Sequence, residues 1–295
     1  MNEAADLLAL AQKHGLNIDP ESLKVNDMGL DYRVVIGSDY GGEEWVLRVP
    51  RREGLADGAA IEARVLELVS PHLSFAVPDW RIHSPELIAY PLLPGKPGLT
   101  LDENGNPVFH VDMASVEYAR DMGDLFYELH SIDTRRAAEI GIPVRSPREV
   151  RENWQSTIDR VSQEFSISGF LMDRWNAWLA DDELWPDFSV LTHGEIYAAH
   201  TLVKGNRITA VLDWTTSEVS DPVRDFSLFH ASAAPEAFDV MLDRYREHGG
   251  TVWSRIREHC TEYMAASPLG YALYAIETGD PQQREIAQAG LSTAG

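Results

Sequence analysis

The N-terminal part of the chain combines strand-like and helix-like hydrophobic patterns. Short apolar or alternating runs predict strands, and they lie at residues 32–36, 43–49, 77–82 and 87–92. Apolar residues at helical spacing predict two helices, at residues 4–11 and 59–69. These elements, followed by the Pro- and Gly-rich residues 91–98, predict a small α+β lobe that ends near residue 92.

The remainder of the chain is mostly helical in its pattern. Apolar residues recur at helical spacing in four segments, residues 122–129, 154–165, 238–245 and 252–263. From Gly279 onward the apolar character falls, and we expect this terminus to fray. The chain is therefore predicted to be an α+β protein with a small β-rich lobe at residues 1–91 and a larger helical lobe at residues 92–295.

One segment of the second half predicts a β-hairpin instead. Two strand-like runs, residues 201–204 and 207–212, flank Gly205-Asn206, which is typical of a two-residue hairpin turn. Counting outward from the turn gives a definite register: Lys204 with Arg207, Leu202 with Thr209, and His200 with Val211.

This register brings two metal-ligating residue types together. Asp213 lies two residues beyond Val211, so His200 and Asp213 become diagonal neighbours on one face. Their backbones are then expected to lie roughly 7–8 Å apart. Such a gap suits a metal ion or a phosphate between the two side chains.

Composition excludes several classes of protein. The 25 Lys and Arg against 47 Asp and Glu give a net charge of −22, which disfavours binding to nucleic acid or anionic membranes and favours a cationic substrate. The single cysteine, Cys260, excludes an internal disulfide and a thiolate zinc site. An acidic N-terminus and the lack of long apolar stretches predict a cytoplasmic protein without a signal peptide.

Three residues follow the spacing of a kinase active site. Protein kinases carry H-R-D-x-x-x-x-N and then D-F-G, in which the first Asp positions the acceptor hydroxyl while the Asn and the second Asp hold magnesium. Here Glu195 of His193-Gly194-Glu195 takes the place of the first Asp, His200 that of the Asn, and Asp213 that of the second Asp. The chain thus resembles the aminoglycoside-phosphotransferase branch of the kinase-like fold.

Within that branch, the chain is similar to the macrolide 2′-phosphotransferases. The similar strings occur in order along the chain, at residues 28–35, 45–52, 77–82, 86–95, 192–203 and 217–222. The resemblance implies a two-lobed protein-kinase-like fold that holds nucleotide between its lobes. It also implies transfer of the γ-phosphate of GTP, or of ATP, to the 2′-hydroxyl of a macrolide's desosamine sugar, with Mg²⁺ as cofactor and antibiotic resistance as the result.

The resemblance implies roles for individual residues. Glu195 would orient the sugar hydroxyl and accept its proton, while Asp213, helped by His200, would hold magnesium. Arg48 stands where kinases have a phosphate-binding lysine. Glu62 projects beside the apolar face of its helix, where an unpaired carboxylate would be costly, so we expect Arg48 as its partner. The remaining nucleotide contacts are expected from Gly29, Tyr90, Pro91, Leu92 and Leu202.

The acceptor pocket is predicted from apolar and aromatic residues, because a macrolactone ring is large and apolar. We expect it to include Tyr197, Phe226, Phe229, Met241, Tyr271 and Tyr274. For His193 we expect a structural role, and for Asp221 and Asp225 a helix-capping or turn role.

Two alternatives remain open. One is a kinase of another small alcohol, such as an aminoglycoside or an amino alcohol. The other is a nucleotide-binding pseudokinase, since Glu195 and Arg48 both depart from the usual kinase residues. In either case we expect a monomer whose partners are a nucleoside triphosphate and a small molecule.

Overall fold

The computed structural model describes residues 3–26 and 31–292. Its backbone divides into two units, residues 1–110 with 198–215 and residues 111–197 with 216–295. The predicted boundary at residues 91 and 92 differs from this division, because the chain stays with the first unit to residue 110 and its hairpin returns there. A functional division at residue 91 stays a prediction.

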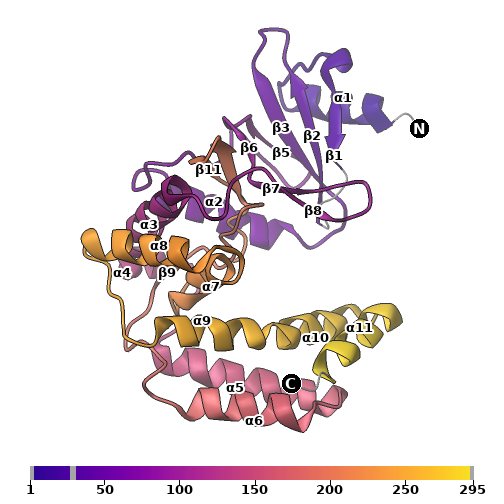
Figure 1. The fold of residues 1–295 in the computed structure, drawn as a ribbon. Coiled ribbons are helices and arrows are strands. Elements are labelled where there is room, and N and C mark those ends of the chain that lie inside the picture. Colours follow the sequence, from indigo (N-terminus) through magenta and orange to yellow (C-terminus); the bar gives the residue numbers. More distant parts are fainter. Residues whose placement is uncertain (1–2, 27–30, 293–295) are drawn as a thin grey trace. The chain divides into compact units, whose positions relative to one another are not determined.

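An antiparallel five-stranded sheet forms the frame of the first unit (Figure 1). Its order is β1-β2-β3-β5-β4, with bounds Lys24–Asn26 (β1), Tyr32–Ser38 (β2), Glu44–Pro50 (β3), Ile82–His83 (β4) and Ile88–Pro91 (β5). Both predicted helices form, as α1 (Glu3–Lys13) and α2 (Ala56–Val69), and a 3-10 turn, η1, spans Pro20–Ser22. Helix α1 packs on the sheet face that holds Val35 and Leu47, whereas α2 packs through Ala59 on the opposite face.

The predicted strand at residues 77–82 is largely wrong, since only Ile82–His83 joins the sheet. Pro78 has no N–H to donate to a strand ladder. Before it, Ala76 pairs with Ala210, and its N–H donates to the Thr209 carbonyl at 3.1 Å. This segment therefore links the five-stranded sheet to a second, smaller one in the same unit.

That smaller sheet contains the predicted hairpin, in the order β11-β10-β6, with β6 at Lys96–Pro97, β10 at Thr201–Lys204 and β11 at Arg207–Val211. The innermost predicted pair, Lys204 with Arg207, is confirmed. A bulge then shifts the register, so that Leu202 pairs with Ala210 instead of Thr209.

The same shift corrects the outer part of the predicted register. Thr201, rather than His200, pairs with Val211, and His200 lies opposite Leu212, whose N–H donates to the His200 carbonyl at 2.8 Å. The bulge is possible because the freed carbonyl of Thr209 accepts the N–H of Ala76.

The second unit is predominantly helical, as predicted. Its helices are α3 (Val116–His130), α4 (Thr134–Glu139), α5 (Pro147–Glu164), α6 (Gly169–Ala180), α7 (Val223–Ser232), α8 (Pro235–Glu247), α9 (Ile256–Ala265), α10 (Ser267–Thr278) and α11 (Pro281–Leu291). A short pair of strands, β9 (Val190–Thr192) and β12 (Glu218–Ser220), lies among them. The first unit also has a small hairpin, β7 (Leu99–Leu101) with β8 (Pro107–Phe109). Among residues 3–26 and 31–292, no helix has the length and apolar character needed to cross a membrane.

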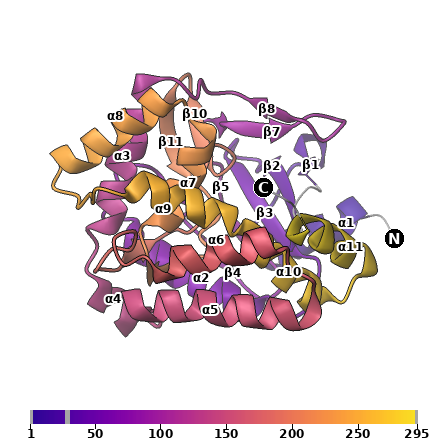
Figure 2. The same ribbon diagram turned by 60° about the horizontal axis from the view of Figure 1, so that its bottom comes forward.

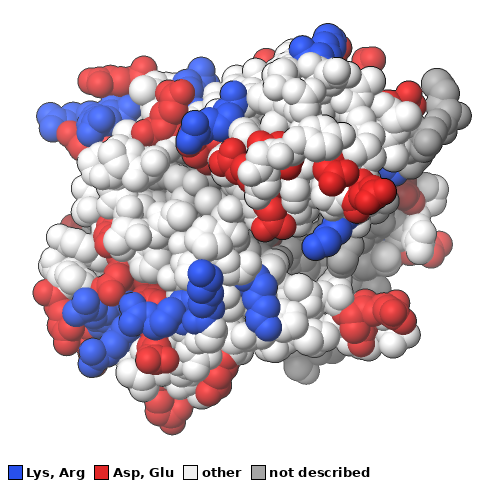
Figure 3. Space-filling view, turned by 90° about the horizontal axis from the view of Figure 1, so that it is seen from above, with Lys and Arg blue, Asp and Glu red and all other residues white. Residues whose placement is uncertain are grey.

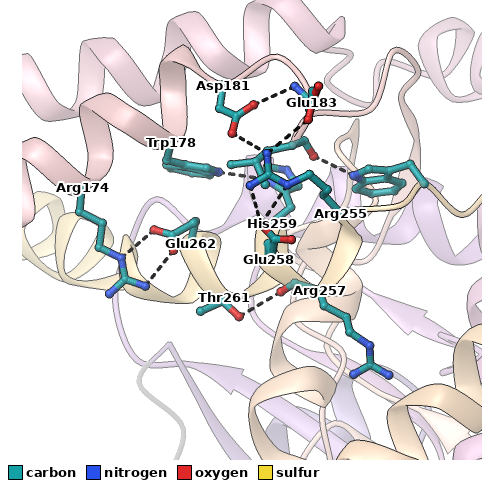
Figure 4. A network of polar contacts seen from close by, with 12 residues as sticks. Arg174, Trp178, Asp181, Glu183, Arg255, Arg257, Glu258, His259, Thr261 and Glu262 are labelled. Carbon is teal, nitrogen blue, oxygen red and sulfur yellow. Dashed lines mark hydrogen bonds and ion pairs between the residues drawn. The ribbon is translucent and has the colours of Figure 1, made fainter.

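Helices α5, α6, α9, α10 and α11 share one apolar core, in which Trp175 and Trp178 are fully buried, and α5 lies beside α6 (Figure 2). Polar contacts tie α6 to α9 at the edge of this core (Figure 4). Arg174 binds Glu262 at 2.7 Å, and the Trp178 indole donates to His259 Nδ1 at 2.9 Å.

The expectation that the chain frays after Gly279 is wrong, because α11 forms there. Gly279 adopts a left-handed conformation (φ 65°) that ends α10, and the Asp280 side chain then accepts the N–H of Gln282 at 2.8 Å. Pro281 occupies the first helical turn, and Leu291 is fully buried in the shared core. Capping residues rather than overall hydrophobicity were the available signal.

We predict that Asp280→Ala loosens α11 selectively. Loss of a side-chain N-cap costs about 1 kcal/mol, which lowers the hydrogen-exchange protection of amides 283–291 about fivefold if they exchange by local opening. Asp280→Ser retains an acceptor and should behave like the parent. Unchanged protection in the alanine variant would show that core packing alone holds this helix.

Candidate active site

A buried ion pair lies in the first unit. Arg48 projects from β3, and its Nη1 lies 2.9 Å from Oε1 of Glu62 on α2. The predicted partnership is thus present, with only 12% and 1% of the two side chains exposed. Burial raises the pKa of the Glu62 carboxyl, and the Arg48 guanidinium opposes this increase. The second carboxylate oxygen, Oε2, is buried without a hydrogen bond of good geometry within the described residues, although the backbone N–H of Trp214 acts to lower the pKa of the group.

His200 and Asp213 also meet in the first unit, as predicted, despite the shifted register. His200 Nε2 lies 3.6 Å from Asp213 Oδ2. Asp213 lies beyond the end of β11 and has a φ of 63°, the only positive value at a non-glycine residue in the described chain. The strained conformation is typical of functional positions.

Neighbouring residues hold this conformation of Asp213. The indole N–H of Trp214, which is fully buried, donates to the Val211 carbonyl at 3.2 Å. Thr215 Oγ1 donates to Asp213 Oδ1 at 2.7 Å, while Oδ2 lies on the side of His200. Since 43% of the Asp213 side chain is exposed, its carboxylate remains accessible to a ligand.

The other predicted nucleotide residues lie at β5 and β10 of the first unit. Tyr90 is buried at the end of β5, and burial raises the pKa of its phenol to about 12. Pro91 ends that strand, and the N–H of Leu92 donates to the Glu44 carbonyl at 2.7 Å. Leu202 is buried in β10. Gly29 falls outside the described residues.

Glu195 belongs to a tightly held loop of the second unit, which follows β9. Its backbone N–H donates to His193 Nδ1 at 3.2 Å, so the structural role expected for His193 is present in the geometry. Gly194 has a φ of 94°, and a Cβ there would lie 2.6 Å from Arg224 Nη2. Only glycine suits this position, because it combines a left-handed backbone with no room for a side chain.

Asp225 anchors this loop through contacts far along the chain, so the helix-capping or turn role expected for it is wrong. The carboxylate, fully buried in the first turn of α7, accepts the N–H groups of His193 at 3.1 Å and Gly194 at 2.6 Å. His130 Nε2 donates to it at 3.0 Å, and His130 Nδ1 lies 3.0 Å from the Tyr245 hydroxyl. Burial alone would raise the pKa of the Asp225 carboxyl, but the donors around it outweigh burial and lower the pKa.

Asp221 has the turn role that was one of the two expected for it, and it makes a second contact. It accepts the N–H of Val223 at the start of α7 at 2.9 Å, and it also binds buried His259 Nε2 at 2.7 Å. Neither His130 nor His259 was singled out from the sequence. The only signal was a histidine within or next to an apolar helical stripe, which also fits many core histidines.

The predicted acceptor residues divide into two groups. Phe226, Phe229 and Met241 pack in the core, and at most 1% of each residue is exposed. The Phe226 ring, for example, packs edge-on against Phe126. These three therefore have no surface to offer a macrolide, and the expectation that they line the pocket is corrected. Tyr197 is half-buried, and 36% of Tyr271 and 42% of Tyr274 are exposed.

Charged side chains do not form one continuous acidic surface on the face that Figure 3 draws. Groups of Asp and Glu alternate there with groups of Lys and Arg. The net charge of −22 therefore gives no direct indication of where a cationic substrate binds on that face.

The family follows from comparison with known proteins. The model of the phosphotransferase enzyme family matches residues 23–259. The chain belongs to this family. Both predictions of this kind, a phosphotransferase that acts on a hydroxyl group and an aminoglycoside phosphotransferase-like α+β fold, are confirmed.

Within this family, the chain is similar to several individual proteins. The macrolide 2′-phosphotransferase MphH from Brachybacterium faecium is 50% identical, with a TM-score of 0.96 over 100% of this chain and 99% of that one. A macrolide 2′-phosphotransferase of type I is 35% identical, with a TM-score of 0.91 over 99% of this chain and 97% of that one. The uncharacterized protein YcbJ of Bacillus subtilis (strain 168) is 36% identical over 98% of this chain and 95% of its own length. The resemblance to the macrolide 2′-phosphotransferases is thus confirmed. Wild-type aminoglycoside 2′-phosphotransferase-IIIa, 16% identical with a TM-score of 0.75 over 99% of this chain and 97% of that one, shares the fold.

We predict that Asp225→Asn lowers the free energy of unfolding by about 3 kcal/mol, because an amide NH₂ would face buried donors. The pKa of the Asp225 carboxyl is lower in the folded state than its ordinary value of 3.8. The ionised carboxyl therefore stabilises the folded state at pH values above 3.8, and this stabilisation is lost as the pH falls through the pKa of the folded state. The stability difference between parent and variant should therefore be constant above about pH 5 and shrink below about pH 4.

Urea unfolding curves between pH 3 and 7 measure this difference. Asp187→Asn, at an exposed aspartate of the same unit, is the matched control and should follow the parent. A difference that stays constant down to the lowest pH would contradict an ionised Asp225.

Proposed function

We propose that this protein is a macrolide kinase that transfers the γ-phosphate of a nucleoside triphosphate to the 2′-hydroxyl of the desosamine sugar of macrolide antibiotics. The observation on which this rests is its similarity to macrolide 2′-phosphotransferase MphH, 50% identical over the whole chain. Since the match includes both units, it extends beyond the nucleotide site to the region that would select the acceptor. The expected result in a cell is macrolide resistance.

The nucleotide phosphates would bind at Arg48. Its guanidinium is fixed by Glu62, and a guanidinium presents several N–H donors in a plane that suits phosphate oxygens. The backbone of Tyr90, Pro91 and Leu92 would contact the nucleotide, and we retain Leu202 and Gly29 as further nucleotide contacts. We further propose that residues 1–91 form a nucleotide-binding lobe and residues 92–295 a catalytic and macrolide-binding lobe.

Magnesium would bind at Asp213 and His200. His200 Nε2 and Asp213 Oδ2 lie 3.6 Å apart, so both side chains would be available to one ion. Because Mg²⁺ prefers oxygen ligands, Asp213 would be the main ligand and His200 the weaker one. No group of three His, Cys, Asp or Glu able to hold a metal occurs among the described residues. A magnesium site does not need three protein ligands, because the ion commonly binds one or two carboxylates together with phosphate oxygens and water. The ion, when bound, neutralises charge on the transferring phosphate.

Glu195 would orient the sugar hydroxyl and accept its proton. Its loop is held by hydrogen bonds at His193 and Gly194, which favours a fixed carboxylate position. In a loose phosphoryl-transfer transition state, orientation of the hydroxyl matters more than strong basicity, so Glu can replace the commoner Asp.

For the donor we propose GTP, on the resemblance to the macrolide 2′-phosphotransferases, with ATP as a weaker substitute. For the acceptor we retain Tyr197, Tyr271 and Tyr274 as contacts, because all three are at least partly accessible. We propose that the protein acts as a cytoplasmic monomer. An aminoglycoside or another small alcohol is the alternative acceptor, and a pseudokinase the alternative to catalysis.

The test is phosphate transfer by the purified protein to a macrolide and to an aminoglycoside, with GTP and ATP in competition. We expect a phosphorylated macrolide, a preference for GTP and no aminoglycoside product, with Asp213→Asn as the inactive control. Transfer only to an aminoglycoside would replace the macrolide assignment, and nucleotide binding without any transfer would support a pseudokinase.

A second prediction concerns Glu195. Glu195→Gln retains the length and polarity of the side chain but cannot accept a proton. General-base catalysis by a positioned side chain contributes roughly 10²–10⁴-fold to the rate. We expect a loss of this size in the single-turnover rate with saturating magnesium–GTP and macrolide. Glu195→Asp retains the charge and should keep a substantial part of the rate. If the Gln variant matched the parent, Glu195 would have no part in the mechanism.

A further inference from the structure

Arg48 lies on an apolar sheet face. Its register places it opposite Val34 of β2 and Ile88 of β5, and the surrounding cluster includes Val46 and Tyr90. A guanidinium in such a place needs more than a charge partner, because it must also be held in a defined plane to meet phosphate oxygens. Glu62 contacts only its Nη1 nitrogen in the described structure.

Two aromatic rings supply the missing contacts. The guanidinium carbon of Arg48 lies 4.4 Å from the ring centre of Tyr32 and 5.5 Å from that of Trp80. Both distances lie within the range of about 6 Å for attraction between a cation and a ring face. Tyr32 reaches Arg48 diagonally across β2 and β3, since it pairs with Pro50, two residues further on.

Trp80 lies beside Arg48 without using its polar group. Its indole nitrogen is buried, and within the described residues it has no hydrogen-bond partner. Leaving a buried N–H unsatisfied is unfavourable, so an indole is a poor choice for filling apolar space. Tryptophan is, however, the side chain that attracts a cation most strongly.

We propose that Tyr32 and Trp80 are positioning residues that hold the Arg48 guanidinium in the orientation needed to bind the nucleotide phosphates. This inference rests on the proposed function. It also explains why arginine stands at the position of the usual kinase lysine: a planar guanidinium stacks on ring faces, whereas a lysine ammonium is a compact, strongly hydrated charge.

The test is a double-mutant cycle between the rings and Arg48. Loss of a buried cation–ring contact corresponds to roughly a 3- to 30-fold effect, so Tyr32→Leu and Trp80→Leu should each lower kcat/KM for the nucleotide by that factor. Tyr32→Phe and Trp80→Phe retain a ring and should restore most of it. In an Arg48→Met background, the leucine substitutions should have no further effect on single-turnover rates.

Phe165→Leu is the matched control. It removes the ring beneath Arg284, 4.7 Å away in the second unit, and should lower thermal stability without changing kcat/KM. An equal loss from Tyr32→Leu in the parent and in the Arg48→Met background would overturn the proposal, as would failure of the phenylalanine variants to restore activity. Normal turnover in Arg48→Met itself would instead refute the phosphate-binding role of Arg48, which belongs to the proposed function.

Discussion

The burial of one ion pair constrains the first unit. Arg48 and Glu62 come from β3 and α2, and both are nearly inaccessible to water. Removing water from two charges costs several kcal/mol for each of them, and only close contact repays this. Helix α2 must therefore lie where Glu62 reaches Arg48, so the pair fixes the helix against its sheet. It also leaves a guanidinium with spare donors beside Tyr32 and Trp80.

The second unit also buries a carboxylate, and hydrogen bonds stabilise it there. The carboxylate of Asp225, fully buried, accepts backbone N–H groups from His193 and Gly194 and a side-chain N–H from His130. Burial opposes ionisation of this carboxyl, but the hydrogen bonds and the electrostatic attraction to His130 and His193 outweigh it and lower the pKa. The loop that contains Glu195 is consequently held against α7 by a buried carboxylate.

Two pairs of side chains in the first unit can be compared with the family assignment. The chain is similar over its whole length to a macrolide 2′-phosphotransferase, and in this structure Arg48 contacts Glu62 and His200 lies beside Asp213. Asp213 has a left-handed backbone that costs energy. Such strain persists only where the surrounding contacts hold it, as Trp214 and Thr215 do here.

The sequence by itself determined the two helices of the first unit, three strands of its sheet, the hairpin turn, and the approach of His200 to Asp213. Periodicity and turn chemistry are local, so they are visible without a fold; the Arg48–Glu62 pair followed from the cost of an unpaired charge on an apolar helix face. Only the tertiary structure decided the hairpin bulge, because Ala76 competes for the Thr209 carbonyl from far along the chain. It also decided that Phe226 is core and that Asp225 anchors a loop, since burial and long-range hydrogen bonds depend on which segments meet.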